Sequence, residues 1–229
     1  MKTPLVSIIT ASYNYAHFLQ ECVHSVQSQT FKDFEHIVVN SGSSDNTSDL
    51  AIKLGVDLLV DLKSSARGSG YNRNQGFAKA HGKYLLNLDA DDSISPTFLE
   101  RVLELAGPDT IVSTGIQRHG ISNVASLPEV PCTYKDLWHH NRLFCCSLMP
   151  RSHFKAVGGF DTSLDGEGGG CEDWELWCSL FRNGCTAKLV PEYLFQYKYH
   201  RIYEDYTPLV ERLHSFNYIR KKHLGALLT

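Results

Sequence analysis

Several features that would place this 229-residue chain in other protein classes are missing from its sequence. No apolar run reaches the roughly 18 residues that a helix needs to span a bilayer. The N-terminal segment lacks the apolar core and cleavage site of a secretory signal, which predicts a cytoplasmic chain. Lysine and arginine total 22 against 25 aspartate and glutamate, a net charge of −3, so no global field attracts a nucleic acid and we expect none as a partner.

Cysteine usage and glycine spacing exclude further classes. The seven cysteines are odd in number and form no CxxC pair, which favours reduced, mostly buried thiols over disulfides or a zinc site. The sequence has no Walker loop, and no GxGxxG follows the first predicted strand. ATP hydrolysis on a Walker loop and dinucleotide binding on that fingerprint are therefore not expected.

Short apolar runs alternate with helical patterns in the first half of the chain. We predict strands over 5–9, 34–39, 56–60, 84–88 and 110–113, with helices between them, the second of which is capped by Ser44 or Asp45. This alternation predicts a single α/β domain with a mainly parallel central sheet flanked by helices. The second half is less regular: loop and edge structure over 115–131, a strand over 143–149, a helix over 172–181, a strand over 193–200 and a helix over 208–224.

Polar segments follow three of the predicted strands. They are Thr10–Asn14, Asn40–Asp45 and Asp89–Asp92. Ligands of parallel sheets bind beyond the carboxyl ends of the strands, so these segments are expected to converge on one edge.

The segment Asp89–Asp92 has three carboxylates within four residues, after a strand that must be buried. Such carboxylates repel one another unless a cation lies among them, and Mg²⁺ or Mn²⁺ prefers oxygen ligands that it can share with a substrate phosphate. A solvated acidic turn is the alternative, but the position at the end of a strand favours a metal site.

Two further segments carry candidate chemistry. Glu172 and Asp173 open a helix after the glycine-rich segment 162–170, where a carboxylate could remove a proton from an acceptor hydroxyl. The helix N-terminus predicts a lowered pKa for Asp173, although acidic residues also favour helix starts for structural reasons alone. In the glycine-containing segment 67–76, Arg67 or Arg73 could pair with a diphosphate, or could simply be solvated.

Six segments, in this order, resemble the family 2 inverting glycosyltransferases, which have the Rossmann-like glycosyltransferase A fold. They are Val6–Asn14, Ser25–Thr30, Arg73–Gly76, Leu88–Asp92, Gly158–Asp161 and Glu172–Trp177. The resemblance runs from residue 5 to about residue 200, and it implies transfer of a sugar, with inversion, from a nucleotide diphosphate sugar to a hydroxyl of a carbohydrate or lipid-linked acceptor. A UDP-sugar is favoured as the donor.

The resemblance also implies roles for individual residues. Asp173 would be the general base with Glu172 assisting or orienting the acceptor, and Asp91 would hold Mn²⁺ or Mg²⁺, with His200 as a second candidate ligand. Donor-binding roles fall on Thr10, Ser12, Tyr13, Asn40, Arg73, Asp89 and Ala90. The loop after the second strand departs from the family, because Asn40 and Ser41 stand where two aspartates are usual. Asn40 could still pair with uracil, guanine or thymine, because an amide both donates and accepts.

The expected organisation is a nucleotide-sugar-binding half over 1–114, an acceptor-binding half over 115–205 and a C-terminal helix over 206–229. That helix carries Arg212, Arg220, Lys221 and Lys222, so peripheral contact with the inner face of a membrane is an alternative to packing on the domain. Two other functions are alternatives to transfer. One is a sugar-1-phosphate nucleotidyltransferase, whose usual glycine-rich signature is missing here, and the other is a non-catalytic module that binds a nucleotide sugar.

Overall fold

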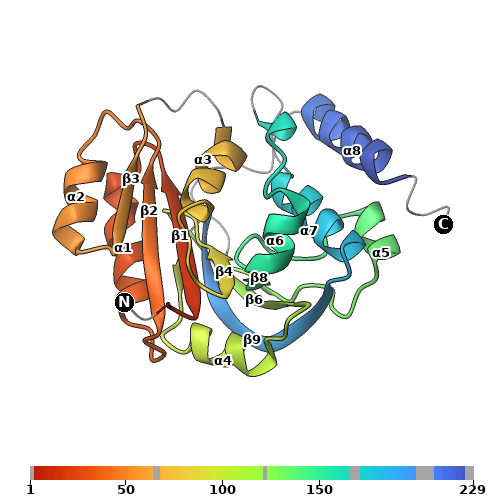
Figure 1. Ribbon diagram of the computed structural model, residues 1–229, viewed down its shortest axis with the longest axis horizontal. Coiled ribbons are helices and arrows are strands. Elements are labelled where there is room, and N and C mark those ends of the chain that lie inside the picture. The colour runs from red at the N-terminus through yellow and green to blue at the C-terminus, as the bar shows by residue number, and fades with distance from the viewer. Residues whose placement is uncertain (1–2, 64–67, 121–122, 166–170, 200–208, 225–229) are drawn as a thin grey trace.

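The computed structural model describes residues 3–63, 68–120, 123–165, 171–199 and 209–224, with only the backbone of residues 209–212. Figure 1 shows two sheets with helices packed around them. The first sheet has the strand order β3–β2–β1–β4–β8 and the second has the order β5–β9–β6–β7. The predicted α/β domain with a mainly parallel central sheet is confirmed by the first of these sheets.

The first sheet is built from buried apolar strands. β1 (Val6–Ser12) pairs in parallel with β2 (Phe34–Asn40) and β4 (Tyr84–Asn87), β3 (Leu58–Asp61) extends β2, and β8 (Met149–Pro150) adds an antiparallel edge. The connections are α1 (Ala16–Gln27), α2 (Thr47–Leu54) and α3 (Gly68–Phe77). α1 buries apolar residues every three or four positions, as a helix covering a sheet must.

The second sheet corrects several predictions. The prediction that residues 110–113 close the parallel series is wrong, because β6 (Thr110–Gly120) runs seven residues further and pairs in parallel with β9 (Thr186–Tyr199). β5 (Ser93–Ile94) and β7 (Ala125–Ser126) complete this sheet, so residues 115–120 are strand rather than loop. Of the strand predicted over 143–149, only Met149 lies in a strand, since Leu148 makes an isolated bridge to Val112.

The remaining helices lie at the centre and right of the view in Figure 1. They are α4 (Phe98–Leu105), α5 (Tyr134–His139), α6 (Arg151–Val157), the short 3₁₀ helix η1 (Thr162–Leu164), α7 (Glu172–Arg182) and α8 (Leu209–His223). None of the helices in the described part of the chain is long and apolar enough to cross a membrane.

The predicted cap of α2 is displaced. Asn46 occupies the N-cap position and makes no side-chain cap bond. The Asp45 carboxylate nevertheless accepts the N–H groups of Thr47 at 3.1 Å and Ala16 at 3.0 Å. Asp45 therefore links the first residues of α1 and α2 and fixes the loop that leads into α2.

α3 lies close on the sheet because of a glycine. A Cβ atom at Gly76 would stand 2.7 Å from Ile9 Cγ2 and 2.8 Å from Val39 Cγ2, closer than van der Waals contact allows. Two residues earlier, Asn74 donates to the Phe160 carbonyl at 2.9 Å and accepts the Phe160 N–H at 3.0 Å. The segments 73–76 and 158–161 are thus in direct contact, although they lie far apart in the sequence.

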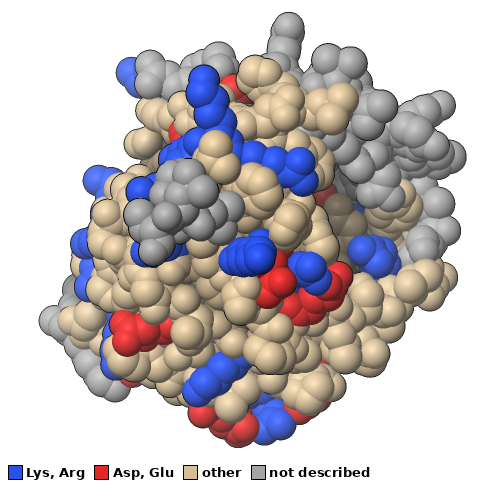
Figure 2. Space-filling view, turned by 90° about the vertical axis from the view of Figure 1, so that its right-hand side faces the viewer, with Lys and Arg blue, Asp and Glu red and all other residues tan. Residues whose placement is uncertain are grey.

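α8 packs on the domain and uses part of its positive charge there. Lys222 Nζ lies 2.6 Å from Asp161 Oδ2 and 2.7 Å from Glu175 Oε1. His223 Nε2 lies 3.0 Å from the same Glu175 oxygen, and both side chains are 1% exposed. Arg220 donates to a backbone carbonyl of α5. Figure 2, which faces this side of the molecule, shows basic and acidic side chains side by side.

The contacts of Lys222 predict a measurable contribution to stability. In the variant Lys222→Met, Asp161 and Glu175 lose the cation that they share, and we expect the free energy of unfolding to fall by about 1–2 kcal/mol. The loss is moderate because Lys222 is partly exposed and Glu175 keeps its bonds to His223 and Ser179. Chemical denaturation at pH 7 measures it. Lys221→Met, an exposed neighbour, is the control and should change stability by less than about 0.5 kcal/mol. Equal losses would contradict the assignment.

Candidate functional site

The polar segments that follow β1, β2 and β4 meet at one edge of the first sheet, as predicted. Asn14 N donates to Ser43 Oγ at 2.9 Å, and Ser44 N donates to Asn14 Oδ1 at 2.8 Å. With the start of α3, these segments enclose a cavity of about 620 Å³, here called the first cavity. Its walls are formed by Ala11, Ser12, Tyr13, Tyr15, Ser41, Gly68, Ser69, Asn72, Arg73, Asp89, Ala90 and Asp91.

Two side-chain oxygen atoms in residues that line the first cavity have no hydrogen-bond partner among the described residues. They are Ser12 Oγ and Asn72 Oδ1, in residues that are 3% and 7% exposed. A buried polar atom left without a partner costs about 1–3 kcal/mol, so such atoms on a cavity wall are candidates to bond a ligand. Ser12 was identified from the sequence, but Asn72 was missed. The sequence feature that could have pointed to Asn72 is its position next to Arg73 in the glycine-containing segment.

The predicted donor-binding residues of β1 and of the segments that follow β1 and β4 only partly line the first cavity. Tyr13, which is 48% exposed, and Ala90 line the first cavity. Thr10 does not, because its side chain is fully buried and its hydroxyl bonds His36 Nε2 at 3.0 Å within the sheet. Ala11, which follows it in the strand, lies on the cavity wall instead.

Asn40 also points away from the first cavity. Its Nδ2 donates to Ser48 Oγ at 2.6 Å and to Asp61 Oδ1 at 3.0 Å, and its Oδ1 accepts the Ser43 N–H at 3.0 Å. The amide thus holds the shape of its own loop, and Asn40 does not line the first cavity. Ser41 lines the cavity in its place, since successive side chains at the end of a strand point in opposite directions.

Arg73 links the end of β4 to the start of α7. Its Nη2 lies 2.8 Å from Asp89 Oδ1 and its Nη1 lies 2.6 Å from Glu172 Oε1, with 10% of the side chain exposed. Ser69 Oγ donates to the same Glu172 oxygen at 2.6 Å. Burial alone would lower the pKa of Arg73, but the two carboxylates raise it above its usual value. Burial alone would raise the pKa of Asp89, and Arg73 instead holds it below its usual value.

A second cavity, of about 580 Å³, shares Arg73 and Asp89 with the first. Its other walls come from α7, from the segment 141–145 and from the strands β6 and β9. They are formed by Ile116, Arg118, Asn141, Leu143, Phe144, Cys145, Glu172, Asp173, Phe195, Tyr197 and Tyr199. The two predicted acidic segments, 89–92 and 172–173, thus open into adjoining spaces.

Asp173 lies partly buried in the second cavity at the start of α7. Its Oδ1 accepts the Trp174 N–H at 2.8 Å and its Oδ2 accepts Asn141 Nδ2 at 2.9 Å. The pKa of Asp173 is raised to about 6, chiefly by burial and next by the charge of Glu172, while the Trp174 N–H, Arg73 and Asn141 each act to lower it. The predicted lowering of this pKa by the helix N-terminus is wrong, because desolvation outweighs it.

Oxygen ligands for a divalent cation gather around the segment 89–92. Asp91 lines the first cavity beside Asp89, and ligand atoms of Asp89, Asp92 and Cys145 lie within 4.8 Å of one another. The carboxylates fit Mg²⁺ or Mn²⁺. The thiol fits them poorly, because burial and the neighbouring carboxylates raise the pKa of Cys145 well above its usual value and keep it protonated. His200, the second predicted metal ligand, and Arg67 lie outside the described residues.

Known structures share this fold. S. aureus TarS 1-349 in complex with UDP-GlcNAc aligns with a TM-score of 0.75 at 18% identity, over 96% of this chain and 71% of that one. The Pyrobaculum calidifontis mannosyltransferase PcManGT, in complex with GDP-Man and Mn²⁺, aligns with a TM-score of 0.66 at 19% identity, over 98% and 63% of the two chains. At these identities the likeness concerns the fold alone.

Comparison with sequence relatives identifies the protein family. The Rickettsia prowazekii uncharacterized glycosyltransferase RP339 is 32% identical over 194 residues, which cover 79% of this chain and 59% of the relative. An uncharacterized glycosyltransferase of Haemophilus influenzae is 28% identical over 227 residues, covering 86% and 66%. The chain therefore spans about three fifths of the length of the Rickettsia relative. The model of Glycosyl transferase family 2 matches residues 7–157, more than half of the chain, and the chain therefore belongs to that family.

Proposed function

We propose that the chain transfers a sugar from a nucleotide diphosphate sugar to a hydroxyl group of an acceptor, with inversion at the anomeric carbon. The observation that carries the proposal is the pair of adjoining cavities that meet at Arg73 and Asp89, with Asp173 in the second. In this proposal residues 1–114 bind the donor, residues 115–205 bind the acceptor, and transfer takes place where the cavities join.

The first cavity is the proposed donor site. Tyr13 offers an exposed side chain for a nucleobase, and Ser12 Oγ and Asn72 Oδ1 offer hydrogen bonds that no described residue takes up. Two proteins of the same fold were solved with nucleotide sugars, UDP-GlcNAc in one and GDP-Man in the other, which supports this class of donor. We favour a UDP-sugar, with a carbohydrate or lipid-linked acceptor.

Asp91, together with Asp89, is proposed to hold Mn²⁺ or Mg²⁺. The residues fit such an ion because both line the first cavity and both carry the carboxylate oxygens that it prefers, and a diphosphate in this cavity would supply further oxygen ligands. The PcManGT structure contains Mn²⁺. When bound, a divalent cation offsets the negative charge that develops on a departing diphosphate.

Asp173 is the proposed general base. It takes the proton of the acceptor hydroxyl while the hydroxyl oxygen forms its bond to the anomeric carbon, and the bond from that carbon to the diphosphate breaks with its electron pair on the diphosphate. A pKa of about 6 leaves this carboxylate mostly ionised at pH 7 and more basic than an ordinary aspartate. Asn141 and the Trp174 N–H fix its orientation. Glu172 is a positioning residue, since it holds Arg73 and Ser69.

The metal role of Asp91 is tested by ligand binding as well as by activity. In the unmodified protein, UDP with Mn²⁺ should raise the melting temperature by several degrees more than UDP alone, since a ligand at 100 times its Kd adds about 2.7 kcal/mol of stability. Asp91→Asn should lose the Mn²⁺-dependent part of this shift, and transfer should fall by at least about 100-fold. Asp49→Asn, at an exposed position on α2, is the control. A full Mn²⁺-dependent shift in Asp91→Asn would reject the role.

The base role of Asp173 predicts both an activity loss and a pH profile. Asp173→Asn should lower transfer by about 10²–10⁴-fold while UDP still binds. In the unmodified protein, kcat/KM should fall as the pH drops below about 6, because protonation removes the base. A rate that stays constant down to pH 5 would contradict the assignment.

Stability gives an independent check on the same residue. The folded pKa of Asp173 lies above the ordinary value of 3.8, so ionisation at higher pH disfavours the folded state. Asp173→Asn should therefore be as stable as the unmodified protein or more stable at pH 8, and this advantage should disappear at pH 4 and below. A loss of activity together with a loss of stability at pH 8 would indicate a structural role instead.

The products of the reaction distinguish the proposed transferase from the two alternative functions. A sugar-1-phosphate nucleotidyltransferase would release pyrophosphate from a nucleoside triphosphate and a sugar phosphate, whereas the proposed reaction releases a nucleoside diphosphate. A non-catalytic module would bind the donor with neither transfer nor hydrolysis. Detection of free UDP from a UDP-sugar, and of no pyrophosphate, is the expected result.

A further inference from the structure

The floor of the second cavity is one face of the β6–β9 ladder. The two strands run parallel, with Ile116 opposite Phe195 and Arg118 opposite Tyr197. Side chains two residues apart on a strand share a face, and Tyr199 continues this face along β9. All five residues line the second cavity, the cavity that contains Asp173. Whatever approaches Asp173 therefore meets an aromatic surface with one guanidinium in it.

Arg118 differs from the other arginine of this cavity in how it is held. Arg73 is engaged by two carboxylates at 2.8 and 2.6 Å. The contact that the structure gives the Arg118 side chain is a hydrogen bond from Nη1 to Ser126 Oγ at 3.5 Å, which is longer and weaker than the roughly 2.7–3.2 Å that is usual for such bonds. Among the described residues no carboxylate forms an ion pair with it. Its guanidinium thus keeps most of its five N–H donors for another partner.

Arg118 is also not the counter-ion of the base. The groups that act on the pKa of Asp173 are its own burial, Glu172, the Trp174 N–H, Arg73 and Asn141. Glu172 and Asp89, the other carboxylates of the cavity, are paired with Arg73. Among the described residues, the carboxylates that line the second cavity are therefore not ion-pair partners of Arg118. Its charge is half-buried, and a half-buried charge is stabilised by an anion far better than by a neutral hydroxyl.

We infer that the acceptor is an acidic saccharide, whose carboxylate or phosphate group is bound by Arg118 while a sugar ring packs against Tyr197 and Tyr199. The planar guanidinium matches both anions, because each presents two oxygens to parallel N–H donors. The aromatic side chains offer the apolar surface that ligand sites place around a few polar groups. This inference rests on the proposed function, since it names the class of substrate for the second cavity.

The test compares three probes that share one ring: phenyl β-D-glucoside, phenyl β-D-glucuronide and phenyl β-D-glucoside 6-phosphate. Binding of each to the full chain is measured by titration calorimetry in the presence of UDP and Mn²⁺, and transfer to each is measured with a UDP-sugar. We expect the acidic probes to bind about 10–100-fold more tightly than the neutral one, because hydrogen bonds to a charged partner are the stronger kind. The tighter of the two acidic probes identifies the anion as a carboxylate or a phosphate.

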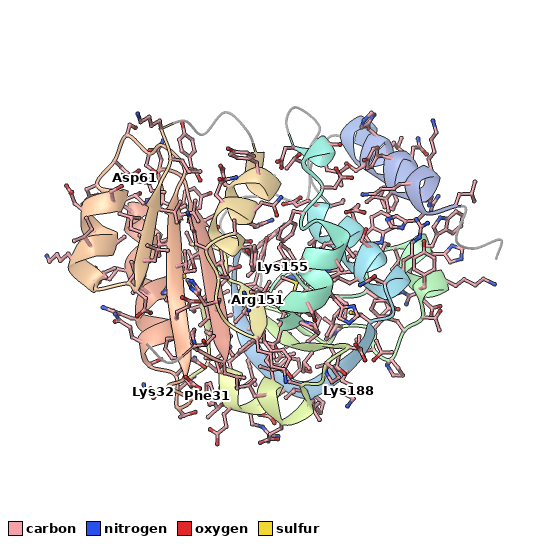
Figure 3. The ribbon with its side chains drawn as sticks, in the orientation of Figure 1. Phe31, Lys32, Asp61, Arg151, Lys155 and Lys188 are labelled. Atoms are coloured by element: carbon pink, nitrogen blue, oxygen red, sulfur yellow. The ribbon has the colours of Figure 1, made fainter. Side chains whose placement is uncertain are left out.

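Variants test whether Arg118 causes the tighter binding of the acidic probes. Arg118→Met should bind all three probes with similar, weak affinity, while the melting-temperature shift caused by UDP stays unchanged. Arg118→Lys should keep part of the preference, because it keeps the charge and loses the planar fork. Lys188→Met is the matched control, since Lys188 is exposed on the same sheet and does not line the second cavity, and Figure 3 labels it at the lower right of the view. It should behave like the unmodified protein.

Several outcomes would overturn the inference. They are equal affinity for the neutral and acidic probes, no measurable binding of either acidic probe, and an equal loss for all three probes in Arg118→Met. The proposed function has a separate readout. A protein that shows the charge preference but neither binds UDP nor releases it from a UDP-sugar would refute the transferase proposal while leaving the anion site of Arg118 supported.

Discussion

The site depends on one buried guanidinium. Arg73 stands between Asp89, at the end of a central strand, and Glu172, at the start of a helix from the other half of the chain. Removing one member of such a buried set would leave an uncompensated charge, so each residue constrains the other two. The arrangement is specific to arginine, because one fork reaches both carboxylates and a lysine ammonium offers no such geometry. The two cavities adjoin at this point because the two halves are joined there.

The same pairing separates the chemistry of two neighbouring carboxylates. One oxygen of Glu172 accepts hydrogen bonds from Arg73 and Ser69, whereas the hydrogen-bond partners of Asp173 among the described residues are one side-chain amide and one backbone N–H. Burial without a dedicated cation, next to the negative charge of Glu172, raises the pKa of Asp173 to about 6. These two acids are adjacent in one helical turn, so the difference in their environments comes from the groups that face them and not from their position in the helix.

The sequence predicts most of the first half, because buried parallel strands and polar strand ends leave strong local patterns. The convergence of the segments after β1, β2 and β4 follows from these patterns, and so does the neighbourhood of Asp89 and Asp91. Side-chain direction at the strand ends does not follow from them. Thr10 and Asn40 each lie one residue before the residue that lines the first cavity, and only the twist and pairing of the strands decide which one faces it. Asn72 was missed for a similar reason, since its orphaned oxygen is visible only in three dimensions.

The second sheet is harder to predict because a bulge decides which face of β9 lines the second cavity. Thr114 pairs with Val190, an offset of 76, whereas Ile116 pairs with Phe195, an offset of 79. The offset changes by three, which is an odd number of residues. The β9 residues that would have faced one side of the sheet therefore face the other side after the bulge. Gly115 lies at this point, where a Cβ would stand 2.7 Å from the Tyr193 ring and 3.0 Å from the Glu192 carbonyl. The alternation of aromatic and polar residues after position 193 predicts a strand but not which set faces Asp173. Without the bulge, the offset of 76 would place Leu194 opposite Arg118, with Glu192 and Gln196 as its neighbours on the same face, and a carboxylate there would alter the charge of the site. The extra residues in β9 instead place Tyr197 beside Arg118, so the chemistry of the second cavity depends on a backbone irregularity that no local sequence pattern reveals.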